Sequence, residues 1–447
     1  MKTIQLSWVQ TLFFAASLLL ILSIILPAQA VIAQQVTSPG GIKAWFVADH
    51  TNPILTVKFT FRGGAALDPA GKEGLSNLVS GLLDEGAGDL KSTAFQQTLE
   101  DLAIGLSFSS GRDEFGGRMK TLVRNQDTAF KLLRLSLSNP RFDAEPLERI
   151  RSQILVGLKQ KSEDPHSIAS QTLFKTLYPT HAYGRPTDGT IGSVEGLKAS
   201  DLRTFVHQRL AKDNLIIGVV GDISAEELGK RLDATFGLLP AKAAPWKVKK
   251  IDPISKGQTI IIDRDIPQSS ILVAEKGLMR EDPDFYAAYV LNHMFGGGSF
   301  TSRLYAEIRE KRGLVYSVST GLYPFDNSAL ILGSAGTANK RAHETLSVIK
   351  AEWDKMATGG VSQKELDDAK TYLTGSFPLR FSSSGRIASM LVGMQSAELP
   401  IDYLQTRNSL IEAVTKDDIK RVAKKLLKSE NLVTIVVGRP DGIKSTN

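Results

Sequence analysis

Cysteine is absent from this sequence of 447 residues. Disulfide bonds and thiolate metal sites are therefore excluded. The absence of cysteine does not indicate whether the protein resides in an oxidising or a reducing compartment. Long runs of like charge are also missing. The net charge is +7, but the 54 Lys and Arg residues are scattered among 47 Asp and Glu residues. This pattern favours a solvated surface of mixed charge over a nucleic-acid-binding face.

Histidine is scarce, and no two histidines stand four residues apart, the spacing of a helical pair of metal ligands. The six residues are His50, His166, His181, His207, His293 and His343. We expect surface or capping roles for them. His181 is expected to order the loop that contains it. A metal site assembled from residues that are distant in the sequence stays open.

One apolar run stands out, TLFFAASLLLILSIILP at 11–27. Lys2 precedes it, and Ala28-Gln29-Ala30 supplies the small residues that signal peptidase accepts, with a second possible cut after Ala33. Residues 1–30 are therefore predicted to be a signal peptide, which implies export to the periplasm. The length of the run also allows an uncleaved anchor in the inner membrane. No later segment is apolar enough to span a bilayer.

The rest of the chain repeats itself. Residues 194–222 match residues 411–439 without a gap, and each segment is an amphipathic helix followed by a β-branched strand that ends at Gly221 or Gly438. Residues 142–160 likewise resemble 361–379, and residues 41–61 resemble 257–277. The repeat predicts two homologous domains, over 36–237 and 259–441.

The segment 238–258, LLPAKAAPWKVKKIDPISKGQ, has the composition of a linker between these domains. Strands follow strands and helices follow helices more often than they alternate. The pattern predicts an α+β fold, in which each domain is a largely antiparallel sheet with helices packed on it. A cleft between the domains is the natural place for a ligand.

The stretch GLSNLVSGLLDEGAG, at 74–88, is predicted to form a helix with an apolar stripe of leucines. The small residues Asn77, Ser80 and Gly81 share the opposite face, so we expect them to be solvated. A glycine at this position costs about 1 kcal/mol relative to Ala. Either the space beside Gly81 is too small for a side chain, or the fold tolerates the lower helix stability that glycine causes.

Three segments carry a family resemblance: GKEGLSNLVSGLLDEGAG at 71–88, THAYGRPTDGT at 180–190 and FGGGSFTSRLYAEIREKRGLVYSVS at 295–319. With them the whole mature chain resembles the M16 family of zinc peptidases, which includes insulinase, pitrilysin and the mitochondrial processing peptidase. The bacterial form has two homologous domains per chain. The resemblance implies a clamshell half that, with its counterpart, encloses an unfolded peptide.

Active members carry His-x-x-Glu-His in the first of these segments, in which the two His hold zinc, the Glu polarises water and a distal Glu completes the site. The resemblance places these positions at Asn77, Ser80, Gly81 and Gly157. An amide, a hydroxyl and two glycines cannot replace imidazole and carboxylate as zinc ligands. No metal and no other cofactor is therefore expected in this chain, which we expect to be inactive alone.

In REKRGLVY the resemblance implies that Arg309 and Tyr316 hold the substrate carbonyl for a zinc site across the cleft. Both side chains donate hydrogen bonds to an oxyanion. The simpler alternative pairs Arg309 with Glu307 or Glu310 and packs Tyr316 in a strand.

The glycines Gly296, Gly297 and Gly298 allow positive φ and close approach of a substrate, but they could equally serve the turn alone. No Lys-Ser or Lys-Thr follows them, so they do not form a phosphate loop.

Some enzymes of this family divide the labour between two homologous chains, only one of which has the zinc motif. The resemblance therefore implies a noncatalytic subunit whose partners are a homologous chain with intact His-x-x-Glu-His and zinc, and an unfolded peptide. Three alternatives stay open: an autonomous zinc peptidase with relocated ligands, a noncatalytic peptide-binding or chaperone-like protein, and a structural component of an envelope complex.

Overall fold

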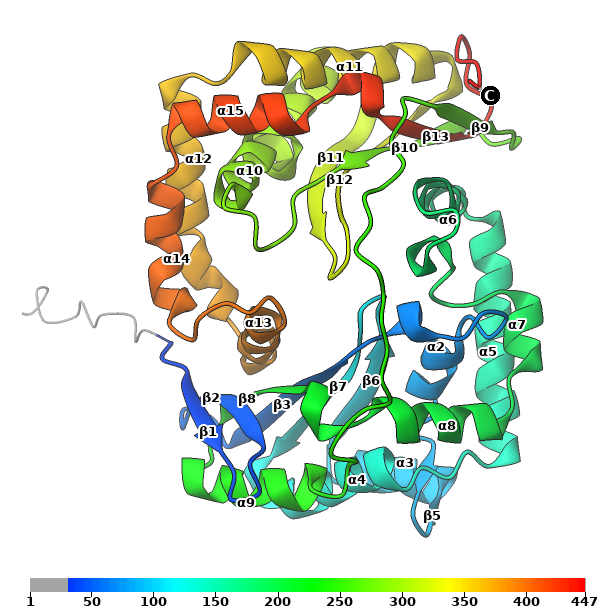
Figure 1. Cartoon of the computed structure of the whole chain (residues 1–447), viewed down its shortest axis with the longest axis vertical. Helices are drawn as coiled ribbons and strands as arrows, with labels where there is room; N and C mark the ends of the chain where they lie inside the picture. The colour runs from blue at the N-terminus through cyan, green and yellow to red at the C-terminus, as the bar shows by residue number, and fades with distance from the viewer. Residues whose placement is uncertain (1–30, 447) are drawn as a thin grey trace, which may run out of the picture.

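The computed structural model describes residues 31–446, and the predicted leader over 1–30 lies outside them. Within the described range, no helix combines the length and the apolar character needed to cross a membrane. Two sheets organise these residues, one below and one above the centre of the molecule in Figure 1.

The first sheet belongs to the N-terminal domain and has six strands. In spatial order these are β1 (Gln34–Thr37), β2 (Lys43–Ala48), β8 (Leu215–Gly221), β3 (Ile54–Arg62), β7 (Glu114–Leu122) and β6 (Gly105–Ser110). All neighbours pair antiparallel except β2 and β8. The sheet is therefore largely antiparallel, as the sequence predicts.

The second sheet belongs to the C-terminal domain. Its strands, again in spatial order, are β11 (Val315–Pro324), β12 (Ala329–Ala338), β10 (Gln268–Lys276), β13 (Val433–Val437) and β9 (Thr259–Ile262). This order repeats that of β6, β7, β3, β8 and β2, and the parallel pair, β13 with β9, falls at the same place. Both copies also end at a glycine with positive φ, 147° at Gly221 and 143° at Gly438. The internal repeat of the sequence is therefore a repeat of topology.

Each sheet buries one face under its own helices. In the N-terminal domain these are α2 (Leu75–Ser80), α3 (Ser92–Asp101), α4 (Gln126–Ser138), α8 (Ala199–Arg209) and α9 (Ala225–Phe236). Helix α5 (Ala144–Glu163) packs beside α2, and α7 (Ile191–Gly196) packs on α5. Alternation along β3 shows the two faces: Val57, Phe59 and Phe61 are fully buried in the core, while Lys58 and Thr60 lie on the opposite face.

The C-terminal domain has a core of its own. Its helices are α10 (Phe285–Asn292), α11 (Ala342–Gly359), α12 (Gln363–Gly375), α14 (Tyr403–Glu412) and α15 (Lys416–Leu426). The largest fully buried side chain there is Trp353, whose ring lies edge-on to Phe295 at 4.9 Å between centroids. Each domain therefore contains the apolar cluster that it needs to hold its own sheet.

One helix of each domain also packs on the sheet of the other domain (Figure 1). Helix α6 (Pro165–Leu177) packs through Leu173 and Leu177 on β10 and β13 of the second sheet. Helix α13 (Ser384–Ser396) packs through Leu391 on β8 and β3 of the first. This exchange buries apolar side chains from both domains, so it fixes how the domains face each other.

The segment between the domains, 238–258, contains no helix or strand and runs from one domain to the other (Figure 1). Several of its amides are hydrogen-bonded; among them, Ile251 N donates to Asn327 O and Ile254 N donates to Leu177 O, each at 2.9 Å. The linker is thus tied to both domains.

Candidate functional site

The short helix α2 and its C-cap carry three of the four positions that the family resemblance assigns to the zinc site, Asn77, Ser80 and Gly81. The helix ends at Ser80 rather than running through 74–88, because Gly81 closes it as the C-cap. The predicted solvated face is also wrong. Ser80 is only 8% exposed and its hydroxyl donates to Asn77 O at 2.8 Å.

Helix α5 closes the remaining space beside α2. A Cβ built on Gly81 would lie 2.9 Å from Ile150 Cγ2, so any side chain here requires Ile150 to move. Gly157 follows Ile150 by two helical turns and therefore faces the same side of α5. A Cβ on Gly157 would meet nothing within 4 Å.

These residues do not fit a zinc ion. Asn77 and Ser80 offer an amide and a hydroxyl that is already bonded to the backbone, Gly81 has no room for an imidazole, and Gly157 has no side chain. Across 31–446, no group of three His, Asp or Glu side chains is placed to hold a metal elsewhere. Relocated ligands therefore gain no support from the described residues.

Three histidines contact other side chains or backbone groups, in a loop cap, a surface ion pair and an aromatic stack. His181 accepts from Tyr183 N through Nδ1 at 3.2 Å and caps the turn at 182–184, which confirms the expected role in ordering its loop. His50 Nδ1 lies 2.5 Å from Asp222. His293 stacks on Tyr372 with ring centroids 5.0 Å apart, and burial lowers its pKa.

Arg309 lies in a π-helical turn, η7 (Tyr305–Glu310), just before strand β11. Three aromatic rings surround its guanidinium: Tyr305 at 4.8 Å, Tyr316 at 5.2 Å and Phe300 at 5.9 Å from Cζ to ring centroid. The structure therefore brings Arg309 and Tyr316 together, through cation–π contacts. Phe300 completes this cluster, and nothing in the spacing of the motif indicated it.

The alternative that pairs Arg309 with a neighbouring carboxylate is wrong. Glu307 binds Lys311 at 2.5 Å and Arg312 at 2.8 Å instead. Within the described residues, no carboxylate lies in ion-pair distance of Arg309, and no acceptor binds its guanidinium. Tyr316 does not pack in the sheet either, since it is 84% exposed. The five guanidinium donors are thus held in place by aromatic rings yet remain available.

The glycines Gly296, Gly297 and Gly298 have a structural role. A Cβ on Gly296 would lie 2.4 Å from Thr320 Oγ1, and one on Gly298 would lie 2.6 Å from His293 O. None of the three has positive φ, which falls instead on Ser299 at 52°. The loop is therefore shaped by close packing against α10 and β11, and it presents Phe300, which is 66% exposed.

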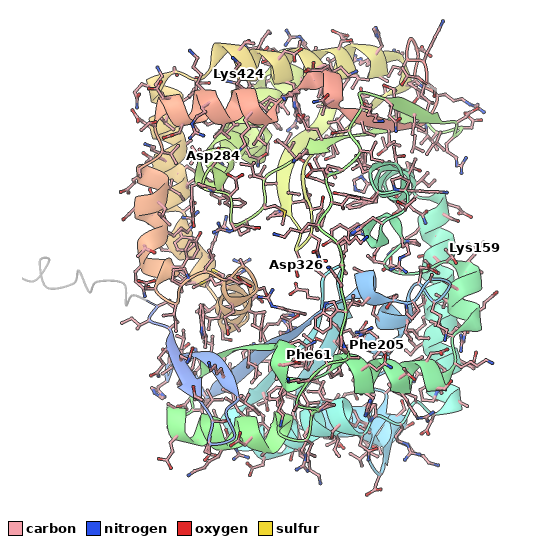
Figure 2. The ribbon with its side chains drawn as sticks, in the orientation of Figure 1. Phe61, Lys159, Phe205, Asp284, Asp326 and Lys424 are labelled. Carbon is pink, nitrogen blue, oxygen red and sulfur yellow. The ribbon has the colours of Figure 1, made fainter. Side chains whose placement is uncertain are left out.

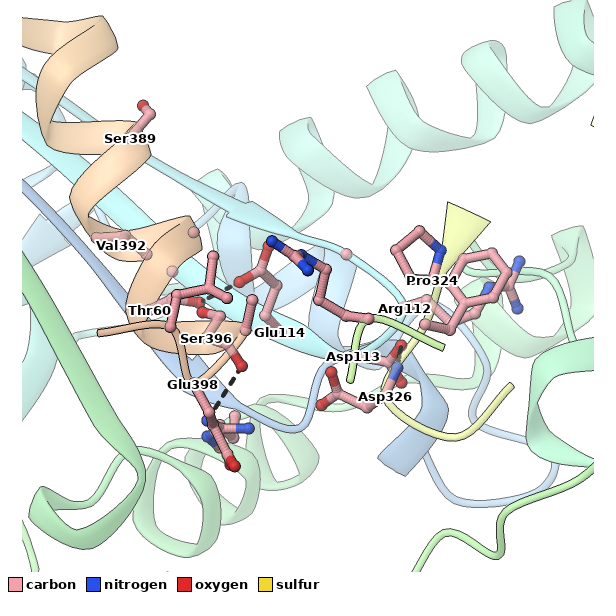
Figure 3. A pocket seen from close by; sticks show the side chains of 18 of the residues that line it. Thr60, Arg112, Asp113, Glu114, Pro324, Asp326, Ser389, Val392, Ser396 and Glu398 are labelled. Carbon is pink, nitrogen blue, oxygen red and sulfur yellow. Dashed lines mark hydrogen bonds and ion pairs between the residues drawn. The ribbon is translucent and has the colours of Figure 1, made fainter. Parts of the chain in front are cut away.

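A cavity of about 1110 Å³ lies between the two domains (Figure 3). It is lined by β3 and the β6–β7 turn of the first domain, and by the β11–β12 turn and α13 of the second. None of the site residues expected from the sequence lines it. The side chains that do line it include Arg112 and Asp113 of the β6–β7 turn and Asp326 of the β11–β12 turn, which share no motif.

The wall of this cavity is also the joint between the domains. Tyr183 donates its hydroxyl to Asp113 at 2.6 Å and accepts from Asn327 N at 3.0 Å. The Arg112 guanidinium lies 4.2 Å from the centre of the Phe174 ring on α6. Burial raises the pKa of Asp113, although the hydrogen bonds from Tyr183 and from Asp326 N oppose that rise.

Comparison with known proteins places this architecture in a family. The model of the peptidase M16 inactive domain matches residues 196–373. A crystal structure of a peptidase M16 inactive domain from Pseudomonas fluorescens superposes with a TM-score of 0.85 at 28% identity, covering 93% of this chain and 100% of that one. The fold of this chain is that of a peptidase M16 inactive domain, and the chain resembles the M16 family.

Two curated relatives carry names that differ in the activity they state. A protein of Helicobacter pylori named non-peptidase homolog YmxG is 26% identical over 95% of this chain and 98% of its own length. A Streptomyces coelicolor protein named an uncharacterized zinc protease is 25% identical over 74% of this chain and 76% of its own length. Asn77, Ser80, Gly81 and Gly157 stand where a zinc peptidase needs imidazole and carboxylate, so this chain is a noncatalytic, M16-like homologue.

Proposed function

We propose that this chain is the zinc-free subunit of an exported, heterodimeric M16 peptidase. It supplies Arg309, Tyr316 and half of a peptide chamber to a homologous partner that carries His-x-x-Glu-His. The observation that carries the proposal is the guanidinium of Arg309, which lies between Tyr305, Tyr316 and Phe300 and has no carboxylate within ion-pair distance among residues 31–446.

The role of Arg309 follows from this geometry. A guanidinium held by rings loses little conformational freedom when it binds, because its position is already set. The exposed hydroxyl of Tyr316 adds a second donor on the same side. Together they can polarise the carbonyl of an extended peptide, while the zinc of the partner supplies the activated water.

The test is peptide hydrolysis by a zinc-bearing homologue, alone and mixed with this chain, with zinc content recorded for both. We expect strong activation by a chain that contains no zinc. Arg309→Ala is expected to lower turnover of the complex roughly 100-fold, the loss typical of one oxyanion donor. Arg264→Ala, which removes an exposed guanidinium bound only to Asp263 O, should leave turnover unchanged.

Assembly, followed by sedimentation or size exclusion, separates the interpretations. Loss of association in Arg309→Ala would make Arg309 a structural residue of the interface. Absence of both activation and association for the unmodified chain would overturn the heterodimer and leave a peptide-binding or structural protein.

A further inference from the structure

Three cations gather on the face of the first sheet that looks away from its core. Lys58 on β3 stands directly opposite Arg118 on β7, and Lys120 follows Arg118 on the same face of the same strand. The residues between them, Val57, Phe59 and Met119, point into the core. We call Lys58, Arg118 and Lys120 the cationic floor.

The cations of the floor are unpaired in the part of the chain that the structure describes. Within residues 31–446, none of its members forms an ion pair or a side-chain hydrogen bond. The one carboxylate on the same face of β7, Glu114, stands opposite Arg62 and accepts from the Thr60 hydroxyl at 3.2 Å. Like charges placed directly across a sheet are destabilising, so the fold keeps an arrangement that costs stability.

Burial lowers the pKa of Lys58. Among the neighbouring charges, Glu114 raises this pKa and Arg118, with a smaller effect, lowers it. A carboxylate brought to this face would relieve the repulsion between Lys58 and Arg118. The floor is therefore suited to a ligand that carries negative charge.

The floor is also accessible. Helix α13 covers the sheet over β8 and β3, but Arg118 and Lys120 on β7 are exposed beyond it. Lys58 lines the cavity between the domains, as do Ser109 and Thr60. The hydroxyl of Ser107, on the same face of β6 and opposite Arg118, adds a polar group beside the cations.

We propose that the cationic floor binds an extended peptide segment with two or more carboxylates. Side chains two residues apart on a strand lie about 7 Å apart, so Asp or Glu at alternate positions of an extended peptide match the spacing of Arg118 and Lys120. The proposal names the substrate class for the chamber of the proposed function, and it rests on that function only for calling the peptide a substrate.

A peptide fits this cavity better than a nucleic acid does. Five carboxylates line other parts of the same wall: Asp113, Glu114, Glu281, Asp326 and Glu398. They would repel a continuous run of phosphates, whereas a peptide can present carboxylates to the floor and neutral or basic side chains to the wall.

The test uses the full chain without a zinc partner. Binding of a short labelled peptide with Asp at alternate positions is measured by fluorescence anisotropy, beside the same peptide with Asn at those positions. We expect the acidic peptide to bind about tenfold more tightly, as three partly exposed ion pairs allow, and the preference to shrink at high salt.

Variants locate the site. A triple variant should lose the preference for the acidic peptide and keep an unchanged circular dichroism spectrum. It combines Lys58→Gln, Arg118→Gln and Lys120→Gln. Lys159→Gln removes an exposed charge from α5 at the periphery (Figure 2) and should leave the preference intact.

Three results would overturn the proposal: equal binding of both peptides, a preference that survives in the triple variant, or tighter binding of a single-stranded oligonucleotide than of the acidic peptide. None of these depends on activation of a partner. Failure of the heterodimer and failure of the acidic site are therefore distinguishable.

Discussion

Single residues show how the positions that resemble a zinc motif are used in this fold. Gly81 leaves room for Ile150, and the Ser80 hydroxyl donates to Asn77 O, so these positions serve packing and local hydrogen bonding. Repacked positions of this kind do not return to ligation by restoring one side chain, because the neighbour that filled the space must move as well.

Another single residue, Glu275, links stability to pH. It is 2% exposed, accepts hydrogen bonds from Trp353 Nε1 and Lys428 N, and burial raises its pKa to about 8. The folded state therefore holds this proton at pH values where the unfolded chain has released it. The Glu275 contribution to the free energy of unfolding is full below the unfolded pKa and declines as pH rises toward 8.

We expect Glu275→Gln, which stays neutral, to flatten this decline by about 2 to 4 kcal/mol between pH 5 and 8. Urea unfolding of both chains across this range measures it, with the exposed Glu310→Gln as control. Parallel curves for Glu275→Gln and the unmodified chain would show that Glu275 does not titrate there.

At the scale of elements, the exchanged helices depend on close approach to the sheets. Gly218 on β8 lies under α13, and a Cβ built on it would lie 2.7 Å from Ala388 O and 3.0 Å from Leu391 Cβ. A backbone oxygen cannot yield as a flexible side chain can, so any larger residue would lift α13 from the sheet.

Gly218→Ala should therefore lower the free energy of unfolding by about 1 to 3 kcal/mol, the range for overpacking. Chemical denaturation measures this change. Gly192→Ala, in exposed helix α7 where a Cβ would meet nothing within 4 Å, is the matched control and should not destabilise. Equal stability of the two variants would mean that α13 can shift without lowering the free energy of unfolding.

At the scale of the whole molecule, the two domains are joined by polar contacts around Tyr183 as well as by the exchanged helices. The hydroxyl of Tyr183, from the loop that resembles a family marker, connects Asp113 of the first domain with Asn327 of the second. The buried Asp113 carboxyl depends on this donor.

Tyr183→Phe leaves that carboxyl without its closest partner, so we expect a loss of about 1 to 3 kcal/mol and faster proteolysis of the linker at 238–258. Limited proteolysis followed by mass spectrometry locates the cleavage. Tyr323→Phe changes a partly exposed ring on β11 and should match the unmodified chain. Unchanged cleavage in Tyr183→Phe would assign the joint to the exchanged helices alone.

Much of this protein follows from its sequence, because the chemistry of a side chain and the period of a repeat are local properties. The types of residue at Asn77, Ser80, Gly81 and Gly157 exclude a zinc site of the family's kind at these positions. The repeated segments predict two copies of one α+β fold. The strand orders of the two sheets agree with that prediction.

Only the tertiary structure decided which residues meet. It buried Ser80, placed Phe300 beside Arg309, gave Glu307 to Lys311 and Arg312, and set Lys58 opposite Arg118. It also passed α6 and α13 between the domains. Some of these contacts join segments that are far apart in the chain. Others select one ion-pair partner among several neighbouring charges. Each depends on how the whole chain packs and not on the properties of any one segment.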